Sequence, residues 1–170
     1  MRTLIILTFI VLFSQLAIGQ KTIMIADKQI KKTKRINEPL EKVWWRWTTH
    51  EGLKTFFGVD NKIELRSGGD FEIYFLMNNP VGLRGSEGCK VMSYFPYQMF
   101  SFSWNAPPQY KELRESGYKT RVIVTFKKIS DKQTEITLTH LDWPDDEKWT
   151  AVFDYYNTAW DAILDNLSKK

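Results

Sequence analysis

The strongest constraint on the fold lies near the C-terminus, where large apolar residues recur at helical spacing over about five turns. The members of this stripe are Trp149, Val152, Phe153, Tyr156, Trp160, Ile163, Leu164 and Leu167. Pro144 and the acidic residues Asp145, Asp146 and Glu147 precede the stripe, and the helix dipole favours negative charge at the N-terminal end. We therefore predict a long amphipathic helix that starts at Pro144 and covers an apolar surface formed by the rest of the chain.

The segment before this helix shows the period-two alternation of β-strands. In one run, for example, Phe71, Ile73 and Phe75 share a face. The expected strands are residues 62–66, 71–77, 89–95, 99–104, 118–129 and 134–143. Because most connections between them are short, the strands should form an antiparallel sheet. The two longer connections, 78–88 and 105–117, are expected to be loops.

Ahead of these strands, the sequence predicts one further strand and two short helices. Residues 23–36 have a lysine-rich middle, which suits an edge strand that avoids pairing with other chains; a basic surface for nucleic acid or anionic lipid is the alternative. Pro39 suits the first turn of a helix, with Asn37 as a possible cap. The apolar stripe of that helix is Leu40, Val43, Trp44 and Trp47. A second short helix carries Leu53, Phe56 and Phe57, and Gly58 should end it.

Residues 1–19 are predicted to be a cleaved signal peptide. Arg2 is followed by an apolar run of about ten residues and then by the small residues Ala17 and Gly19, which is typical of such a segment. The run is shorter than the roughly 20 apolar residues needed to cross a bilayer. We therefore expect export to the periplasm or out of the cell, no stable membrane insertion of the mature chain, and a single domain over residues 20–170. A retained membrane anchor is the alternative.

The composition argues against most familiar catalytic and metal-binding classes. Cys89 is the only cysteine, so neither an intramolecular disulfide nor a cysteine-based zinc site is expected. The two histidines, His50 and His140, belong to no metal-binding motif, and no Gly-rich phosphate loop or serine-nucleophile motif is present. The net charge of +4 is small. We therefore expect no metal, no cofactor and no nucleic-acid partner.

Taken in order, these elements resemble the START-like (SRPBCC, helix-grip) superfamily, and most closely the family named after activators of the heat-shock-protein-90 ATPase. The segments that carry the likeness are residues 38–44, 53–57, 66–71, 96, 100–104, 138–140 and 160–167. The resemblance implies an α+β fold of the helix-grip (START/Bet v-like) type. Its order would be a strand, two short helices, a six-stranded antiparallel continuation and a long C-terminal helix packed on the curved sheet, with a cavity between sheet and helix. Members of the superfamily bind lipids, sterols, polyketides and other apolar molecules there, and some cyclise or hydrolyse them.

Aromatic residues make up 15% of the chain, which suggests an interior that is either bulky or built around a pocket. Together with the resemblance, this predicts a cavity that binds a small apolar molecule of unknown identity. The cavity residues expected from strand parity and helical spacing are Trp44, Trp47, Phe56, Phe71, Ile73, Phe75, Phe102, Trp104, Val124, Leu138, His140, Tyr156 and Trp160. The alternative is that these rings meet and fill the middle. The loops 78–88 and 105–117 should flank the mouth, where Arg84 and Arg114 could meet an anionic ligand group or be solvated.

Two other functions stay open beside simple binding. His140 shares the inner face of its strand with Ile136 and Leu138, so it is a weak candidate for the acid/base of a cyclase or hydrolase; a structural histidine beneath the helix is the other interpretation. A co-chaperone-like protein-interaction module would instead use exposed aromatic residues such as Trp45 or Trp149. The co-chaperone role of the family belongs to the cytosol, so the family name does not carry over as a function for a chain expected to be exported. The sequence does not indicate the oligomeric state.

Overall fold

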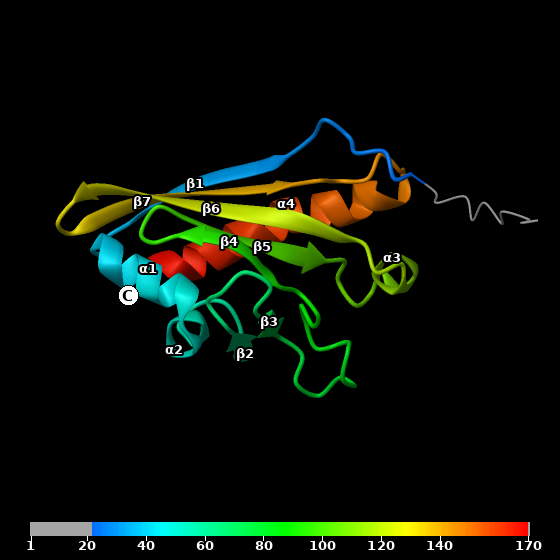
Figure 1. Cartoon of the computed structure of the whole chain (residues 1–170), viewed down its shortest axis with the longest axis horizontal. Helices are drawn as coiled ribbons and strands as arrows, with labels where there is room; N and C mark the ends of the chain where they lie inside the picture. The colour runs from blue at the N-terminus through cyan, green and yellow to red at the C-terminus, as the bar shows by residue number, and fades with distance from the viewer. Residues whose placement is uncertain (1–21, 170) are drawn as a thin grey trace, which may run out of the picture.

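The computed structural model describes residues 22–169 (Figure 1). Its elements, in chain order, are β1 (Ile30–Ile36), α1 (Leu40–Thr48), α2 (His50–Lys54), β2 (Asp60–Ile63), β3 (Phe71–Tyr74), β4 (Val91–Phe95), β5 (Met99–Asn105), α3 (Lys111–Glu115), β6 (Lys119–Ser130), β7 (Gln133–Leu141) and α4 (Lys148–Ser168). The predicted signal peptide, residues 1–19, lies outside the described residues. Within residues 22–169, no helix combines the length and the apolar character that crossing a membrane requires.

Five strands form one antiparallel sheet in the order β1-β7-β6-β5-β4. The predicted alternation is clearest in β7, whose buried positions are Thr134, Ile136, Leu138 and His140. The strand register places the buried residues of neighbouring strands side by side: Val122 of β6 lies opposite both His140 of β7 and Phe102 of β5. Apolar side chains of the central strands therefore gather on one face of the sheet, where they form one wall of the core.

The other two strands, β2 and β3, form a separate two-stranded sheet, so the predicted six-stranded continuation is divided in two. β3 ends at Tyr74 rather than Met77. The backbone N–H groups of Phe75 and Leu76 both donate to the carbonyl of Arg84, at 2.8 and 2.9 Å, and this turn takes the chain out of the ladder. As a consequence Phe75 is 37% exposed instead of pointing into the core.

α4 runs along one face of the five-stranded sheet, and α1 and α2 lie near its C-terminal end (Figure 1). The predicted apolar stripe packs as expected, with Trp149, Val152, Tyr156, Trp160, Leu164 and Leu167 buried. The helix begins at Lys148 and not at Pro144. Asp146 accepts a hydrogen bond from the backbone N–H of Lys148 at 2.9 Å, so an acidic side chain does satisfy a free donor at this end.

β1 lies at one edge of the sheet, the place expected for the lysine-rich strand, although it starts at Ile30 rather than at residue 23. Two of its three lysines face α4: Lys32 pairs with Asp161 at 2.8 Å and Lys34 pairs with Asp165 at 2.6 Å. Exposed ion pairs of this kind contribute little to stability. They do place these two basic groups of β1 against acidic groups of the same molecule.

Two further details differ from the prediction. Asn37 does not cap α1, because its side-chain oxygen accepts a hydrogen bond from the amide of Gln133 at 2.9 Å, and Pro39 occupies the N-cap position. The predicted loop 105–117 contains the short helix α3. Its Leu113, like the preceding Tyr110, packs half-buried against the core, which gives this turn an anchored side.

Candidate functional site

The middle of the molecule, between the sheet and α4, is filled by interlocking aromatic rings. The ring centroids of Phe71 and Phe102 are 4.2 Å apart, and Trp104 lies 5.6 Å from both Phe57 and Trp160. Such contacts combine large apolar burial with favourable ring geometry. The centre of the fold is therefore filled by aromatic side chains, which was the alternative to a central ligand cavity. A ligand site has to lie beside this cluster.

His140 lies beneath α4 with both ring nitrogens occupied. The indole N–H of Trp160 donates to Nδ1 at 3.0 Å, which leaves the ring proton on Nε2, 2.6 Å from the hydroxyl of Thr120. That hydroxyl in turn donates to the carbonyl of Trp104 at 2.9 Å. His140 is fully buried, and burial holds its pKa well below the usual range. This arrangement corresponds to the structural interpretation of His140, with the neutral imidazole joining β6, β7 and α4.

A cavity of about 310 Å³, called here the apolar cavity, opens beside the aromatic cluster. Its wall comes from α4, from the segment after β3 and from the loop after β5. The lining residues are Phe57, Phe75, Leu76, Arg84, Gly85, Trp104, Asn105, Pro107, Pro108, Gln109, Tyr155, Tyr156, Ala159, Trp160, Ala162 and Ile163. The volume is at the lower end of the range of small-molecule sites, and the lining has the usual mixture of many apolar groups and few polar ones.

The space arises from a second flank of α4, next to its buried stripe. Tyr155, Ala159, Ala162 and Ile163 recur on this flank at helical spacing. The two alanines present only methyl groups there, and Phe75 across the gap has left the β3 ladder. Neither side therefore fills the volume between them.

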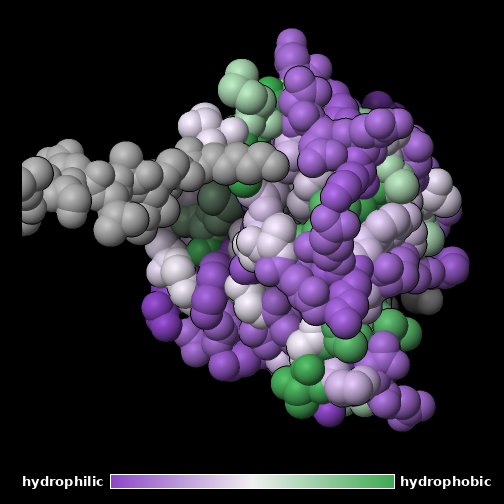
Figure 2. Space-filling model, turned by 90° about the vertical axis from the view of Figure 1, so that its right-hand side faces the viewer, coloured by the Kyte–Doolittle hydropathy of each residue, from purple (hydrophilic) through white to green (hydrophobic). Residues whose placement is uncertain are grey.

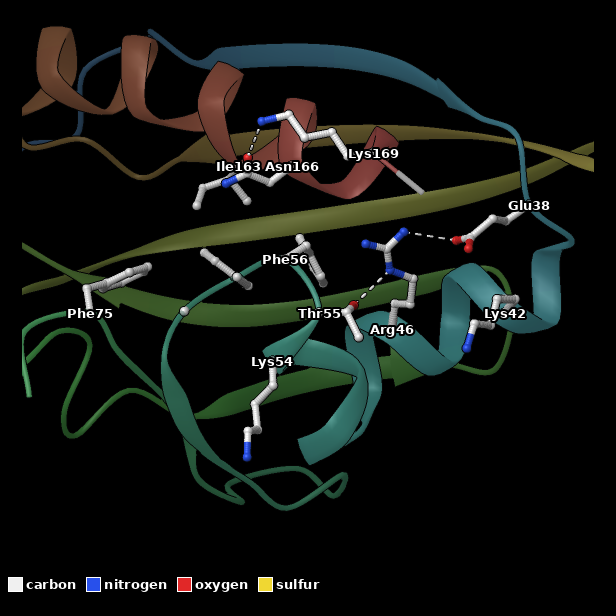
Figure 3. A pocket seen from close by; sticks show the side chains of 12 residues that line it. Glu38, Lys42, Arg46, Lys54, Thr55, Phe56, Phe75, Ile163, Asn166 and Lys169 are labelled. Atoms are coloured by element: carbon white, nitrogen blue, oxygen red, sulfur yellow. Dashed lines mark hydrogen bonds and ion pairs between the residues drawn. The ribbon is translucent and has the colours of Figure 1, made fainter.

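A second cavity of about 580 Å³, called here the basic cavity, lies at the C-terminal end of α4 (Figure 3). Its lining residues are Glu38, Lys42, Arg46, Lys54, Thr55, Phe56, Phe57, Gly58, Phe75, Ile163, Asn166 and Lys169. The two cavities share Phe57, Phe75 and Ile163, so they adjoin along α4. The basic cavity has four cationic side chains and one carboxylate.

Arg46 is the buried cation of the basic cavity, with 4% of its surface exposed. Nη1 donates to Glu38 at 3.0 Å and to the carbonyl of Leu167 at 2.6 Å, and Nε donates to the hydroxyl of Thr55 at 2.9 Å. Phe56 lies against the guanidinium, with its ring centroid 5.3 Å from Cζ. Arg46 thus joins α1 to the C-terminal end of α4, where backbone carbonyls need donors.

The long loops around the apolar cavity are held together by Arg114, which does not line that cavity. Its guanidinium donates to the carbonyls of Gly82, Gly85 and Ala106 at 2.6 to 2.9 Å and pairs with Glu87 at 2.9 Å. The side chains of this ion pair are 10% and 14% exposed. Arg84, in contrast, lines the apolar cavity.

Five of the thirteen predicted cavity residues line the two cavities. Phe75, Trp104, Tyr156 and Trp160 line the apolar cavity, and Phe56 and Phe75 line the basic one. The other eight lie in the filled core and line neither of these cavities: Trp44, Trp47, Phe71, Ile73, Phe102, Val124, Leu138 and His140.

Sequence reasoning missed the alanine flank of α4 and Arg46. A signal for the alanines was present, since Ala159 and Ala162 lie beside the aromatic stripe at helical spacing. No local pattern marks Arg46, because its burial depends on Leu167, which lies 121 positions away in the chain.

The aromatic residues considered for a protein contact are less available than expected. Trp149 is 4% exposed and packs against Tyr118 and Trp143, with ring centroids 5.6 and 6.3 Å away. The ammonium of Lys42 lies over Trp45 at 3.8 Å. The surface seen in Figure 2 is largely hydrophilic, and its hydrophobic groups gather in separate small areas.

A sequence model of the family described as activator of Hsp90 ATPase homolog 1-like protein matches residues 37–169. The chain belongs to this family. The resemblance to this family predicted a helix-grip fold, in which a long C-terminal helix packs on an antiparallel sheet. The structure confirms this fold. No curated protein matches the chain by sequence.

Several solved structures share this fold. A protein from Mesorhizobium loti is 16% identical with a TM-score of 0.65, and the match covers 83% of this chain and 94% of that one. The Aha1 dimer from Colwellia psychrerythraea is 21% identical with a TM-score of 0.61, covering 83% and 93%. An Hsp90 activator from Plasmodium falciparum is 17% identical with a TM-score of 0.61, covering 82% and 92%. At these identities the likeness establishes the fold alone.

Proposed function

We propose that this protein binds a small, largely apolar molecule in the apolar cavity and carries out no chemical step on it. The observation that supports this most directly is a space of about 310 Å³ beside a filled aromatic core, bounded by Trp104, Tyr156 and Trp160. Aromatic walls with few polar groups suit a flat or aliphatic guest.

The proposal gives His140 a structural role and leaves the cyclase or hydrolase alternative without its acid/base. A general acid or base has to reach the reacting atoms directly or through one water. His140 is fully buried, hydrogen-bonded on both sides and absent from the walls of both cavities. A reaction at this site would need another residue.

The proposal also includes export, for which the pattern of residues 1–19 is the support. If the signal is cleaved as predicted, the protein recovered from the periplasm or medium should begin at Gln20, which intact mass determines. The Hsp90 activation named for the Plasmodium falciparum relative is not extended to this chain, since an exported protein would not meet a cytosolic chaperone.

Substitution of one cavity alanine tests the binding site. Ala159→Trp should place an indole in the apolar cavity and weaken the uptake of the neutral dye Nile red by about tenfold or more, since the dye has to find other space. Ala151→Trp is the matched control, because Ala151 lies on the same helix, is exposed and does not line the cavity. Fluorescence titration of the mature protein and both variants gives the affinity and the stoichiometry.

The expected result is saturable binding of one dye per chain to the wild-type protein and to Ala151→Trp, with weaker binding to Ala159→Trp. Wild-type protein without saturable uptake would overturn the proposal. Equal affinity in Ala159→Trp and Ala151→Trp would place the dye elsewhere and would count against this cavity.

A further inference from the structure

We propose that the ligand of this protein is an amphiphile with a single negative charge, such as a long-chain carboxylate. Its apolar part would occupy the apolar cavity, and its anionic head would bind Arg46 in the basic cavity. This inference rests on the proposed function and names the chemical class of the ligand. It is carried by the charge and hydrogen bonding of the basic cavity and by its position next to the apolar one.

Arg46 has one donor group to spare. Nε and Nη1 are occupied by Thr55, Glu38 and Leu167, and within residues 22–169 no hydrogen-bond partner serves Nη2. In Figure 3 this second terminal nitrogen points away from Glu38, into the space between α1 and α4. Arg46 as a residue is 4% exposed, and its guanidinium is held by three hydrogen bonds. Such a group loses little freedom when an anion binds to its remaining N–H groups.

The surrounding charge favours an anion at this point. Lys42, Lys54 and Lys169 line the same cavity, and no carboxylate among the described residues pairs with any of them. In Figure 3 the ammonium groups of Lys42 and Lys54 point away from Arg46. These two ammonium groups would not touch an anion bound at Arg46, but their charges raise the positive potential around the cavity. Arg46 would make the direct contact with the anion.

The number of donors selects the kind of anion. A phosphate dianion requires several converging donors, and Glu38 already balances part of the charge of Arg46. A monocarboxylate needs one or two N–H groups. The amide N–H groups of Asn166 lie in the same cavity and offer a weaker contact. The hydroxyl of Thr55 offers none, because it already donates to the carbonyl of Gly52 at 2.6 Å.

The two cavities adjoin, so one molecule can occupy both. Phe57, Phe75 and Ile163 form the common boundary. Phe75 is 37% exposed and lies beyond the end of β3, so its ring can shift at small cost. An aliphatic chain that passes this boundary would follow the flank of α4 from Asn166 towards Tyr155, which is about 16 Å along the helix axis.

The experiment compares decanoate with decan-1-ol, which has the same chain and no charge, by displacement of Nile red from the mature protein. Decanoate should displace the dye at a concentration about tenfold lower than the alcohol, because a charge-assisted hydrogen bond is added. Arg46→Gln should reduce this preference to about parity. Because Arg46 also joins α1 to α4, circular dichroism and thermal unfolding must show that this variant is folded.

A second variant does not depend on the stability of Arg46→Gln. Lys42→Gln combined with Lys54→Gln removes two exposed charges from the basic cavity and should lower the preference for decanoate by about threefold, with the alcohol unaffected. Lys127→Gln combined with Lys132→Gln is the matched control, because both of these lysines are exposed and line neither cavity. The control should keep the full preference.

The outcomes separate the two proposals. If Nile red fails to bind the wild-type protein, the proposed function is wrong. If the dye binds and both compounds displace it equally, the apolar site stands and the anionic head is wrong. The preference for decanoate could survive both Arg46→Gln and the double variant at Lys42 and Lys54 but disappear in Arg84→Gln. That result would place the anionic head at Arg84 in the apolar cavity and overturn the assignment to Arg46.

Discussion

The buried His140 should make the stability of this protein fall between neutral and mildly acidic pH. In the folded protein, burial holds the pKa of His140 well below 6.5, and the indole N–H of Trp160 occupies the nitrogen that a second proton would need. In the unfolded chain the imidazole titrates normally, with a pKa of about 6.5. Below this pH the unfolded state therefore binds a proton that the folded state does not, and stability decreases as pH falls.

The size of the effect follows from linkage. Each pH unit below about 6.5 costs about 1.4 kcal/mol from one such histidine, so the free energy of unfolding should be about 2 kcal/mol lower near pH 5 than near pH 7.5. The carboxylates with lowered pKa, such as Asp70 at about 2, have ordinary values near 4 when unfolded, so they contribute below this window. Urea unfolding followed by tryptophan fluorescence across this pH range measures the slope.

Substitution of each of the two histidines identifies the source. His140→Asn should lower stability at neutral pH by about 2–4 kcal/mol, because Trp160 and Thr120 lose a buried partner, and it should remove the acid slope. His50→Asn is the matched control, since His50 is the only other histidine and its side chain is 45% exposed; it should keep the slope that His140 produces. A slope that persists in His140→Asn would refute this account of the buried imidazole, as would a wild-type protein equally stable at both pH values.

Two other predictions test the loops and the thiol. Arg114→Met should lower the free energy of unfolding by about 3–5 kcal/mol, because it removes the cationic partner of the largely buried Glu87 carboxylate and the donors to three loop carbonyls; urea unfolding that showed no change in Arg114→Met would contradict the role given to the pair. Cys89 is fully buried, and burial raises the pKa of its thiol to about 12. It should therefore react with iodoacetamide at mildly alkaline pH only after unfolding, and rapid labelling of the folded protein, seen by intact mass, would disagree with this packing.

Most of the secondary structure was predictable, because its signals are local. The stripe from Trp149 to Leu167 defined α4, and the alternation in β7 placed His140 on the inner face. Errors fell at element ends, where hydrogen bonds from other segments decide. β3 stops at Tyr74 because the next two N–H groups bond to Arg84, and a residue ten positions away is outside any strand pattern.

The candidate site was predicted only in part, because a cavity is the space that packed surfaces leave between them. Strand parity placed Phe102 and Leu138 inside correctly, but it could not show that neighbouring rings would meet there and close the centre. The apolar cavity depends on small side chains, Ala159 and Ala162, facing a segment that has left its sheet.

By itself, the amino-acid sequence determined which faces of the strands and of the C-terminal helix are apolar, and hence that a sheet and a helix must cover each other. Only the tertiary structure decided where the covering is incomplete. It also decided that Arg46 lies buried between α1 and the last turn of α4. The reason is physical: apolar periodicity acts over a few residues of chain, whereas residual space and the burial of a charge depend on how elements distant in the sequence fit together.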